Sequence, residues 1–193
     1  SALIVLNTKL AVANLYKELN EDAELEKEEV EIIYLTTNQC PKHRLEIINN
    51  MKERLKKLRS SKDERKIICV STKLVEAGVD IDFDIVYRSL AGIDSVIQCG
   101  GRCNREGEKP SKGSLFIFKH GDENLKYLPD IRKQREAAET ALKVISTTGL
   151  KDEEIDMEKA CDYYFHKLYL NEEAQGKYLE YPIGDNETIF NLL

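Results

Sequence analysis

The chain has 193 residues, of which 41% are hydrophobic and 33% are charged, and its formal net charge at pH 7 is −6. This length suits one α/β domain with a shorter appendage, and it buries enough surface to exclude wholesale disorder. The sequence has no apolar run near the roughly 20 residues of a membrane-spanning helix and no visible signal peptide, so we expect a cytoplasmic protein without membrane contacts.

The cysteines and histidines predict neither a disulfide framework nor a metal site. The five cysteines are scattered, and the nearest spacing, C-x3-C, lacks the second ligand pair of a zinc site. His43, His120 and His166 are isolated from one another in the sequence. We expect surface or packing roles for them. Because the first residue is Ser1 rather than Met, we also expect a piece of a longer protein.

In the first part of the chain, short apolar runs alternate with longer amphipathic segments, a pattern typical of β-α-β units with a mostly parallel sheet. Strands are predicted at residues 3–7, 30–35, 67–71, 85–88 and 114–118. Helices are predicted at residues 8–20, from 41 to a break at 60–64, and at 94–104. We expect Thr8 to cap the first helix and Asp94 or Ser95 to cap the third.

The strand pattern stops after residue 120, where helices are predicted at residues 129–146 and 153–170 and the end from residue 171 is ambiguous. We therefore predict an α/β lobe over residues 1–120, with helices flanking a mostly parallel sheet, and a C-terminal helical appendage over residues 121–193. The appendage is rich in acidic residues, which makes it a poor nucleic-acid surface.

Polar segments follow three of the predicted strands, and ligands of parallel α/β sheets bind beyond the carboxyl ends of the strands. Asn7 and Thr8 follow the first strand, Ser71 and Thr72 follow the third, and a segment that starts at Gln98 comes after the fourth. We expect all three segments to line this edge. The hydroxyl and backbone N–H groups of Ser71 and Thr72 could hold a phosphodiester, although ordinary loop capping would explain them too.

The loop after the third strand contains a glycine and three alternating acids. Gly78 predicts either a positive φ or a close packing contact. Asp80 could accept a hydrogen bond from a hydroxyl such as that of a ribose, whereas Asp82 and Asp84 are expected to cap the loop.

The segment after the fourth strand carries two arginines three positions apart. If the helix continues through it, Gln98, Arg102 and Arg105 share one face. The forked donors of arginine suit phosphate oxygens, and two adjacent glycines, Gly100 and Gly101, suggest that a backbone or a ligand approaches closely. The alternative is a pair of surface arginines bound to nearby acids.

Together these segments resemble the motifs of the second RecA-like lobe of superfamily 2 helicases. Residues 7–9 resemble motif IV, residues 72–80 motif V and residues 98–105, QCGGRCNR, motif VI. The segment VEAGVDIDFD, followed by LAGIDSVIQCGGRCNREG, is most similar to the corresponding sequence of the CRISPR-associated helicase–nuclease of type I interference systems. The resemblance covers about residues 3–118.

The resemblance implies a division of roles at the nucleotide. Arg102 and Arg105 would be arginine fingers that reach the γ-phosphate of ATP across a cleft, and Gln98 would help to arrange the hydrolysis site. Gly78 and Asp80 would meet the ribose. This sequence departs from the family in one respect, because cysteine and glycine stand where motif VI commonly has arginine and alanine, so one positive charge is missing.

The resemblance also implies that Asn7, Thr8 and Thr72, with Ser71 beside them, hold the sugar-phosphate backbone of a single DNA strand. The sequence lacks a G-x-x-x-x-G-K-S/T phosphate loop, a D-E-x-H box and the His-Asp pair of a metal-dependent nuclease. We therefore expect an N-terminal RecA-like lobe of the same full-length protein to hold most of the ATP and Mg²⁺, and a nuclease domain elsewhere in it.

The full-length protein would then be an ATP-dependent helicase that translocates on single-stranded DNA and acts with a CRISPR surveillance complex in antiviral defence. The chain alone is expected to be inactive. Two alternatives stay open at this point. One is another superfamily 2 motor, such as an RNA helicase or a restriction translocase, and the other is a non-catalytic interaction module with a helicase-like shape.

Overall fold

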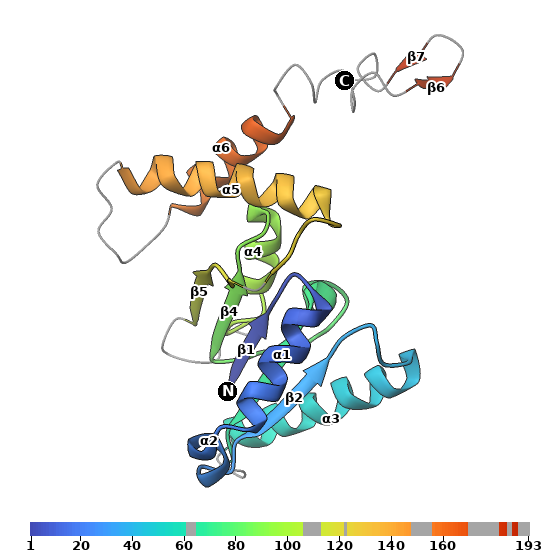
Figure 1. Ribbon diagram of the computed structural model, residues 1–193, viewed down its shortest axis with the longest axis vertical. Coiled ribbons are helices and arrows are strands. Elements are labelled where there is room, and N and C mark those ends of the chain that lie inside the picture. The colour runs from blue at the N-terminus through green and yellow to red at the C-terminus, as the bar shows by residue number, and fades with distance from the viewer. Residues whose placement is uncertain are drawn as a thin grey trace. The chain divides into compact units, whose positions relative to one another are not determined.

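The computed structural model describes residues 1–60, 65–105, 113–121, 123–147, 156–169, 182–184 and 187–188. The chain divides into two compact units, Ser1–Tyr127 and Leu128–Leu193 (Figure 1). The first unit extends past residue 120, where the sequence analysis placed the boundary. A carboxylate oxygen of Glu123 lies 2.7 Å from Nδ2 of Asn7, so the segment after the last strand is bound back to the start of the chain.

Within the described residues, the first unit is built on a five-stranded sheet in which every neighbouring pair is parallel. The strand order is β2-β3-β1-β4-β5. The strands are β1 (Ala2–Val5), β2 (Glu31–Leu35), β3 (Ile67–Ser71), β4 (Ile85–Ser89) and β5 (Ser114–Phe118). This topology confirms the predicted α/β fold with a parallel sheet, and it places β1 in the centre.

Helix α1 (Lys9–Asn20) covers one face of the sheet. Alternate residues of a strand point to opposite faces, so Leu6 points to the same side as Ile4. Because Ile4 lies opposite Val70 in the strand register, Leu6 and Val70 share one face of the sheet. They form a buried cluster with Ala11 and Val12 of the helix. This contact explains why the helix keeps its apolar residues on one face.

The opposite face is covered by α3 (Pro41–Arg59) and α4 (Ile93–Gly100). Leu3 of β1 belongs to this second cluster, together with Met51 of α3 and Cys99 of α4. Figure 1 shows the sheet between α1 and these helices. The first unit is therefore a layered α/β lobe with helices on both faces.

The helix starts confirm one capping prediction and correct another. The Thr8 hydroxyl accepts a hydrogen bond from the backbone N–H of Ala11 at 3.1 Å, as expected of an N-cap. Helix α4 instead starts after Gly92, which has no side chain to cap it, so the prediction of Asp94 or Ser95 is wrong. Ser95 is the third residue of α4, and its side chain is buried instead of capping the helix start.

The end of α4 also differs from the prediction, because the helix stops at Gly100 instead of continuing to Asn104. Two consecutive glycines have low helix propensity, and the following residues bond to another part of the chain. The Phe83 N–H donates to the Arg102 carbonyl at 2.9 Å, and the Asn104 N–H donates to the Phe83 carbonyl at 3.2 Å. Asn104 takes a positive φ of 49° in this turn.

Two short elements complete the first unit, namely α2 (Ala23–Lys27) and a single 3-10 turn, η1 (Lys73–Val75). The second unit contains α5 (Pro129–Thr147), α6 (Met157–Tyr169) and the short antiparallel strands β6 (Pro182–Gly184) and β7 (Glu187–Thr188). The two helices pack against each other.

Of the helices in the described ranges, none has the length and apolar character needed to cross a membrane. Residues 106–112, before β5, and most of the ambiguous end from residue 171 lie outside the described residues.

Candidate functional site

The carboxyl edge of the sheet brings together two of the polar segments found in the sequence. Thr8 follows β1, and Ser71, the last residue of β3, lies opposite Val5 of β1 in the strand register. The Ser71 hydroxyl is buried and donates to the Leu35 carbonyl at 2.7 Å. Thr72 comes next in the chain and is 9% exposed. Thr8 and Thr72 therefore lie on neighbouring strand ends, as predicted.

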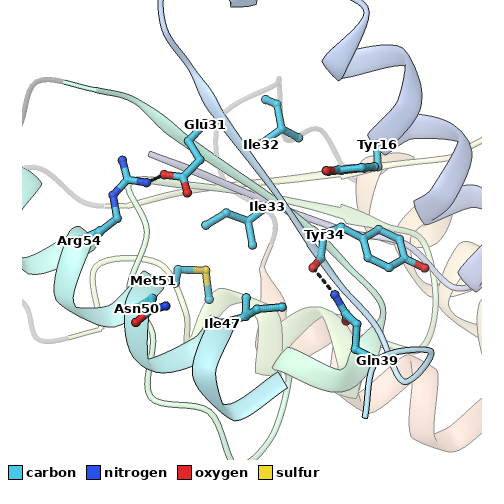
Figure 2. Close-up of a pocket in the computed structure, with 10 residues that line it drawn as sticks. All are labelled: Tyr16, Glu31, Ile32, Ile33, Tyr34, Gln39, Ile47, Asn50, Met51 and Arg54. Carbon is cyan, nitrogen blue, oxygen red and sulfur yellow. Dashed lines mark hydrogen bonds and ion pairs between the residues drawn. The ribbon is translucent and has the colours of Figure 1, made fainter. Parts of the chain in front are cut away.

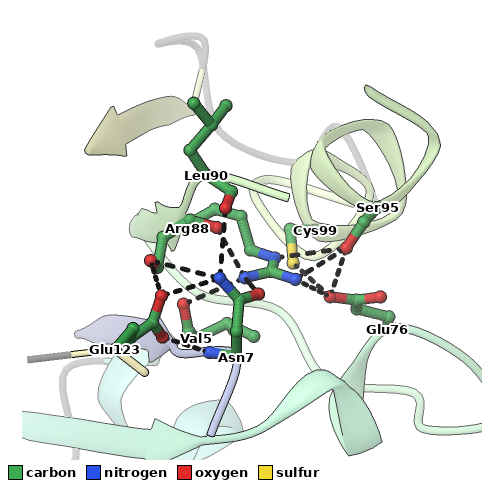
Figure 3. Close-up of polar contacts among 9 residues, drawn as sticks. Val5, Asn7, Glu76, Arg88, Leu90, Ser95, Cys99 and Glu123 are labelled. Atoms are coloured by element: carbon green, nitrogen blue, oxygen red, sulfur yellow. Dashed lines mark hydrogen bonds and ion pairs between the residues drawn. The ribbon is translucent and has the colours of Figure 1, made fainter. Parts of the chain in front are cut away.

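Asn7 shares this edge, but its side chain is bound inside the unit (Figure 3). Its Nδ2 donates to the Leu90 carbonyl at 3.1 Å and to a carboxylate oxygen of Glu123 at 2.7 Å. Its Oδ1 accepts from Nη1 of Arg88 at 2.8 Å. Both ends of the carboxamide are thus used by protein partners.

The arginine segment lies at the opposite, amino edge of the sheet. Helix α4 starts after the carboxyl end of β4 and runs back along it. The Arg102 carbonyl then accepts from Phe83, two residues before β4 begins. The expectation that all three segments line one edge is therefore wrong, and so is the shared helical face of Gln98, Arg102 and Arg105, because α4 ends before both arginines.

Arg102 is 9% exposed, and its guanidinium binds the backbone of the loop after β3. Nε donates to the Val75 carbonyl at 3.0 Å, and Nη2 donates to the Glu76 carbonyl at 2.6 Å. Burial, and next the charge of Arg105, lowers the pKa of Arg102 below its ordinary value. The arginine segment is therefore fastened to the loop that contains the motif V resemblance.

Arg105 is exposed and reaches the same loop further along. Its Nη1 lies 3.1 Å from Oδ1 of Asp80, whose Oδ2 lies 3.3 Å from Nζ of Lys52. The hydrogen bond and charge of Lys52, with a smaller contribution from Arg105, hold the pKa of Asp80 below its usual range. Ion pairs between exposed groups contribute little stability, so the pair with Asp80 holds the Arg105 side chain only weakly.

The glycines of these segments differ in what they provide. Gly78, two residues before Asp80, has a φ of 72°, so the predicted positive φ is confirmed. A Cβ added at Gly100 would lie 3.4 Å from Cδ2 of Leu115 on β5, which is a close contact within the protein. Gln98 lies on the exposed side of α4, near its end.

Sequence reasoning missed a buried charged residue in the centre of the lobe. Arg88 of β4 is 1% exposed, and its Nη2 lies 2.9 Å from a carboxylate oxygen of Glu76. The signal was present in the sequence, because a charged residue in a strand of a parallel sheet has both faces of the strand covered and needs a buried partner.

A surface pocket with a volume of about 380 Å³ lies elsewhere, at the edge strand β2. Figure 2 shows Ile33 of β2 and Met51 of α3 in its wall, with Gln39 donating to the Tyr34 carbonyl at the strand end. Its lining includes none of the predicted site residues. Within the described residues, no three His, Cys, Asp or Glu side chains are grouped as metal ligands.

A RecA-like lobe that carries these motif segments in this order is typical of the second lobe of superfamily 2 helicases. The chain belongs to the family described as CRISPR-associated nuclease/helicase Cas3, C-terminal, whose model matches residues 1–108. It is 31% identical over 133 residues to the CRISPR-associated nuclease/helicase Cas3 of Methanothermobacter thermautotrophicus, which covers 67% of this chain and 14% of that protein. The Haloferax volcanii protein of the same name is 48% identical over 57 residues, 30% of this chain and 6% of that protein.

Solved structures of low sequence identity show the same fold. The crystal structure of T. fusca Cas3-ATP superposes with a TM-score of 0.67 at 20% identity, over 91% of this chain and 22% of that chain. A structure titled CRISPR RNA-guided surveillance complex, pre-nicking, matches with a TM-score of 0.61 at 17% identity, over 91% of this chain and 22% of that chain. The chain thus spans only a small part of these longer proteins.

Proposed function

We propose that this chain is the C-terminal motor lobe of an ATP-dependent helicase that translocates on single-stranded DNA during CRISPR interference. An N-terminal RecA-like lobe of the full-length protein would hold most of the ATP and Mg²⁺, and this lobe would supply Arg102 and Arg105 as arginine fingers. A nuclease domain of the same protein would cut the strand, and a CRISPR surveillance complex would load it. The 193-residue chain alone would not hydrolyse ATP.

The observation that carries the proposal is the convergence of two distant segments at the amino edge of the sheet. Nη1 of Arg105 lies 3.1 Å from Oδ1 of Asp80. Arg102 donates to the Val75 and Glu76 carbonyls, which lie five and four residues before Asp80 in the same loop. A nucleotide that used Asp80 would therefore have both guanidinium groups near it. Gln98, exposed near the end of α4 and four residues before Arg102, would help to arrange the site.

The geometry supports a clamp mechanism. Thr8 and Thr72, at the carboxyl edge, would hold the strand, while the arginines at the amino edge would bind the γ-phosphate. Closure of the two lobes around ATP would engage the fingers, and loss of the γ-phosphate would release them. In this mechanism the DNA strand and the nucleotide are bound at opposite edges of one sheet. A movement of the lobe caused by ATP binding or hydrolysis would therefore also move the bound DNA.

Replacement of Arg105 by alanine in the full-length protein tests the finger role. A finger contributes a factor of about 10³–10⁵ to the rate, so we expect ATP turnover to fall at least about a hundredfold. ATP binding should stay within a few-fold. The matched control is Arg132→Ala, an exposed arginine on α5, which should leave turnover unchanged. Turnover near the wild-type value in Arg105→Ala would refute the role.

An RNA motor is the alternative that a comparison favours, because the chain is 34% identical over 92 residues to ATP-dependent RNA helicase SUB2 of Coccidioides immitis, 46% of this chain. ATPase activation by single-stranded DNA and by RNA of the same sequence separates the two. A requirement for the 2′-hydroxyl would favour RNA. Absence of any ATPase activity in the full-length protein would favour a non-catalytic interaction module.

A further inference from the structure

Arg88 is the hub of a buried polar network that joins segments far apart in the sequence (Figure 3). Its guanidinium points into the lobe from the next-to-last residue of β4, near the carboxyl edge of the sheet, and each part of the fork has a partner. Nη1 donates to the Ser89 carbonyl at 2.6 Å and to Oδ1 of Asn7 at 2.8 Å. Nη2 and Nε both donate to the Ser95 hydroxyl, at 2.8 Å and 3.3 Å.

One side of the hub leads to the arginine fingers. Nη2 of Arg88 lies 2.9 Å from Oε1 of Glu76, and the Ser95 hydroxyl donates to the same oxygen at 2.7 Å. The backbone carbonyl of Glu76 accepts from Nη2 of Arg102 at 2.6 Å. Glu76 is therefore held through its side chain by Arg88 and through its backbone by Arg102.

The other side of the hub leads to the strand-binding edge, which is the carboxyl edge of the sheet where Thr8 and Thr72 would bind the DNA strand. The Asn7 carboxamide that accepts from Arg88 belongs to the residue directly before Thr8. Glu123 fixes the far end of this carboxamide and also accepts from the Ser89 hydroxyl at 2.6 Å. The residues that follow β1 are thus hydrogen-bonded to Arg88, so a displacement of this segment acts on the Arg88 side chain.

This network is well suited to transmit a movement, because its charged members are almost completely buried, while Asn7 at its end is partly buried. Arg88 is 1% exposed, and Glu76 and Glu123 are each 8% exposed. A buried charge that loses a partner has no water to replace it, so breaking one of these contacts is costly. A displacement of one side chain therefore favours a displacement of its partners. Only arginine has enough donors in a fixed fork to bind Asn7, Ser95 and Glu76 at once.

We infer that Arg88 is a positioning residue that couples the occupancy of the strand-binding edge to the placement of the arginine fingers. The inference rests on the proposed function, and it identifies where the two edges of the lobe are joined. Arg88 touches neither the strand nor the nucleotide in this arrangement. It acts through Asn7 on one side and through Glu76 on the other.

The test measures coupling rather than activity. The affinity of the full-length protein for single-stranded DNA is measured with and without a non-hydrolysable ATP analogue, and the ratio of the two dissociation constants reports the coupling. In Arg88→Lys the ammonium can still pair with Glu76 but cannot bridge to Asn7 and Ser95 at the same time. We expect the ratio to move toward one by about fivefold or more.

The matched control is Arg54→Lys, which changes an arginine paired with Glu31 on the edge strand, away from the hub. It should leave the ratio at the wild-type value. Ser95→Ala is the second variant, because it removes only the hydroxyl between Arg88 and Glu76 and is expected to fold even if Arg88→Lys does not. It should also reduce the coupling.

Wild-type coupling in both Arg88→Lys and Ser95→Ala would overturn the inference and leave the proposed motor function standing. If the wild-type protein instead shows no effect of the ATP analogue on DNA affinity and no ATP turnover stimulated by DNA, the proposed function fails, and the inference fails with it. A loss of coupling in Arg54→Lys equal to that in Arg88→Lys would also overturn the inference, because the effect would then not be specific to the hub.

Discussion

Replacement of Arg88 by methionine should destabilise the first unit strongly. The variant keeps most of the apolar stem but leaves Glu76, 8% exposed, without its cation. Removal of one partner of a buried ion pair costs about 3–5 kcal/mol, because the remaining charge stays in a poorly solvated site. The Ser95 hydroxyl, 2.7 Å from Oε1 of Glu76, still donates to it, so we expect a value near the lower end.

The double variant Arg88→Met with Glu76→Leu makes this reasoning testable. Removal of both charges takes away the penalty of an unpaired carboxylate, so most of the lost stability should return. A deficit of about 1–2 kcal/mol should remain, because Asn7 and Ser95 lose buried hydrogen-bond partners. Adding Glu76→Leu to Arg88→Met should therefore raise the free energy of unfolding. Two independent destabilising mutations would instead lower it further.

The assay is urea unfolding of the 193-residue chain, followed by far-ultraviolet circular dichroism. Arg54→Met serves as the control, because the Arg54–Glu31 pair is partly exposed and its loss should cost only about 1 kcal/mol or less. A cost below about 1 kcal/mol for Arg88→Met, or a double variant less stable than the single one, would refute the account of a buried and charged hub.

Four further outcomes are expected at single glycines and cysteines. Gly113→Ala should destabilise the chain by about 1–3 kcal/mol in urea unfolding, because the new Cβ would lie 2.5 Å from Sγ of Cys103, and adding Cys103→Ala should return part of the loss. Gly78→Ala should cost about 1–2 kcal/mol, since its φ is 72°, and a smaller effect than Gly113→Ala is expected because nothing lies within 4 Å of the new Cβ. Burial raises the pKa of the Cys69 thiol from 9.0 to about 12, so the folded chain holds this proton more tightly than the unfolded chain. The contribution of this thiol to stability should therefore be constant below about pH 9 and be lost between about pH 9 and 12, and Cys69→Ala should remove that part of the pH dependence. In native alkylation the exposed Cys40 should react well before Cys69.

The sequence was sufficient for the elements whose signals are local. Strand β3 occupies residues 67–71 as predicted, because an apolar run bounded by polar residues is read directly from the chain. The Thr8 cap is also local, since donor and acceptor are three residues apart. The parallel sheet followed from the alternation of such runs with amphipathic helices.

The site was harder to predict where it depends on contacts between distant segments. Helix α4 was expected to continue through Arg102, but the β-bridge between Phe83 and Cys103 ends it, and no local pattern predicts that bridge. For the same reason the sequence placed the arginines at the carboxyl edge, whereas α4 carries them back to the amino edge. The sequence also gave no way to see that Asn7 would be bound by Glu123 and Arg88.

The central claim is that Arg105 leaves Asp80 for a triphosphate that another lobe holds. Its most direct test is a structure of the full-length protein with a non-hydrolysable ATP analogue and single-stranded DNA. We predict that Nη1 of Arg105, now 3.1 Å from Oδ1 of Asp80, lies within about 3 Å of a γ-phosphate oxygen. A closed complex in which Arg105 still pairs with Asp80, or points away from the nucleotide, would contradict the claim.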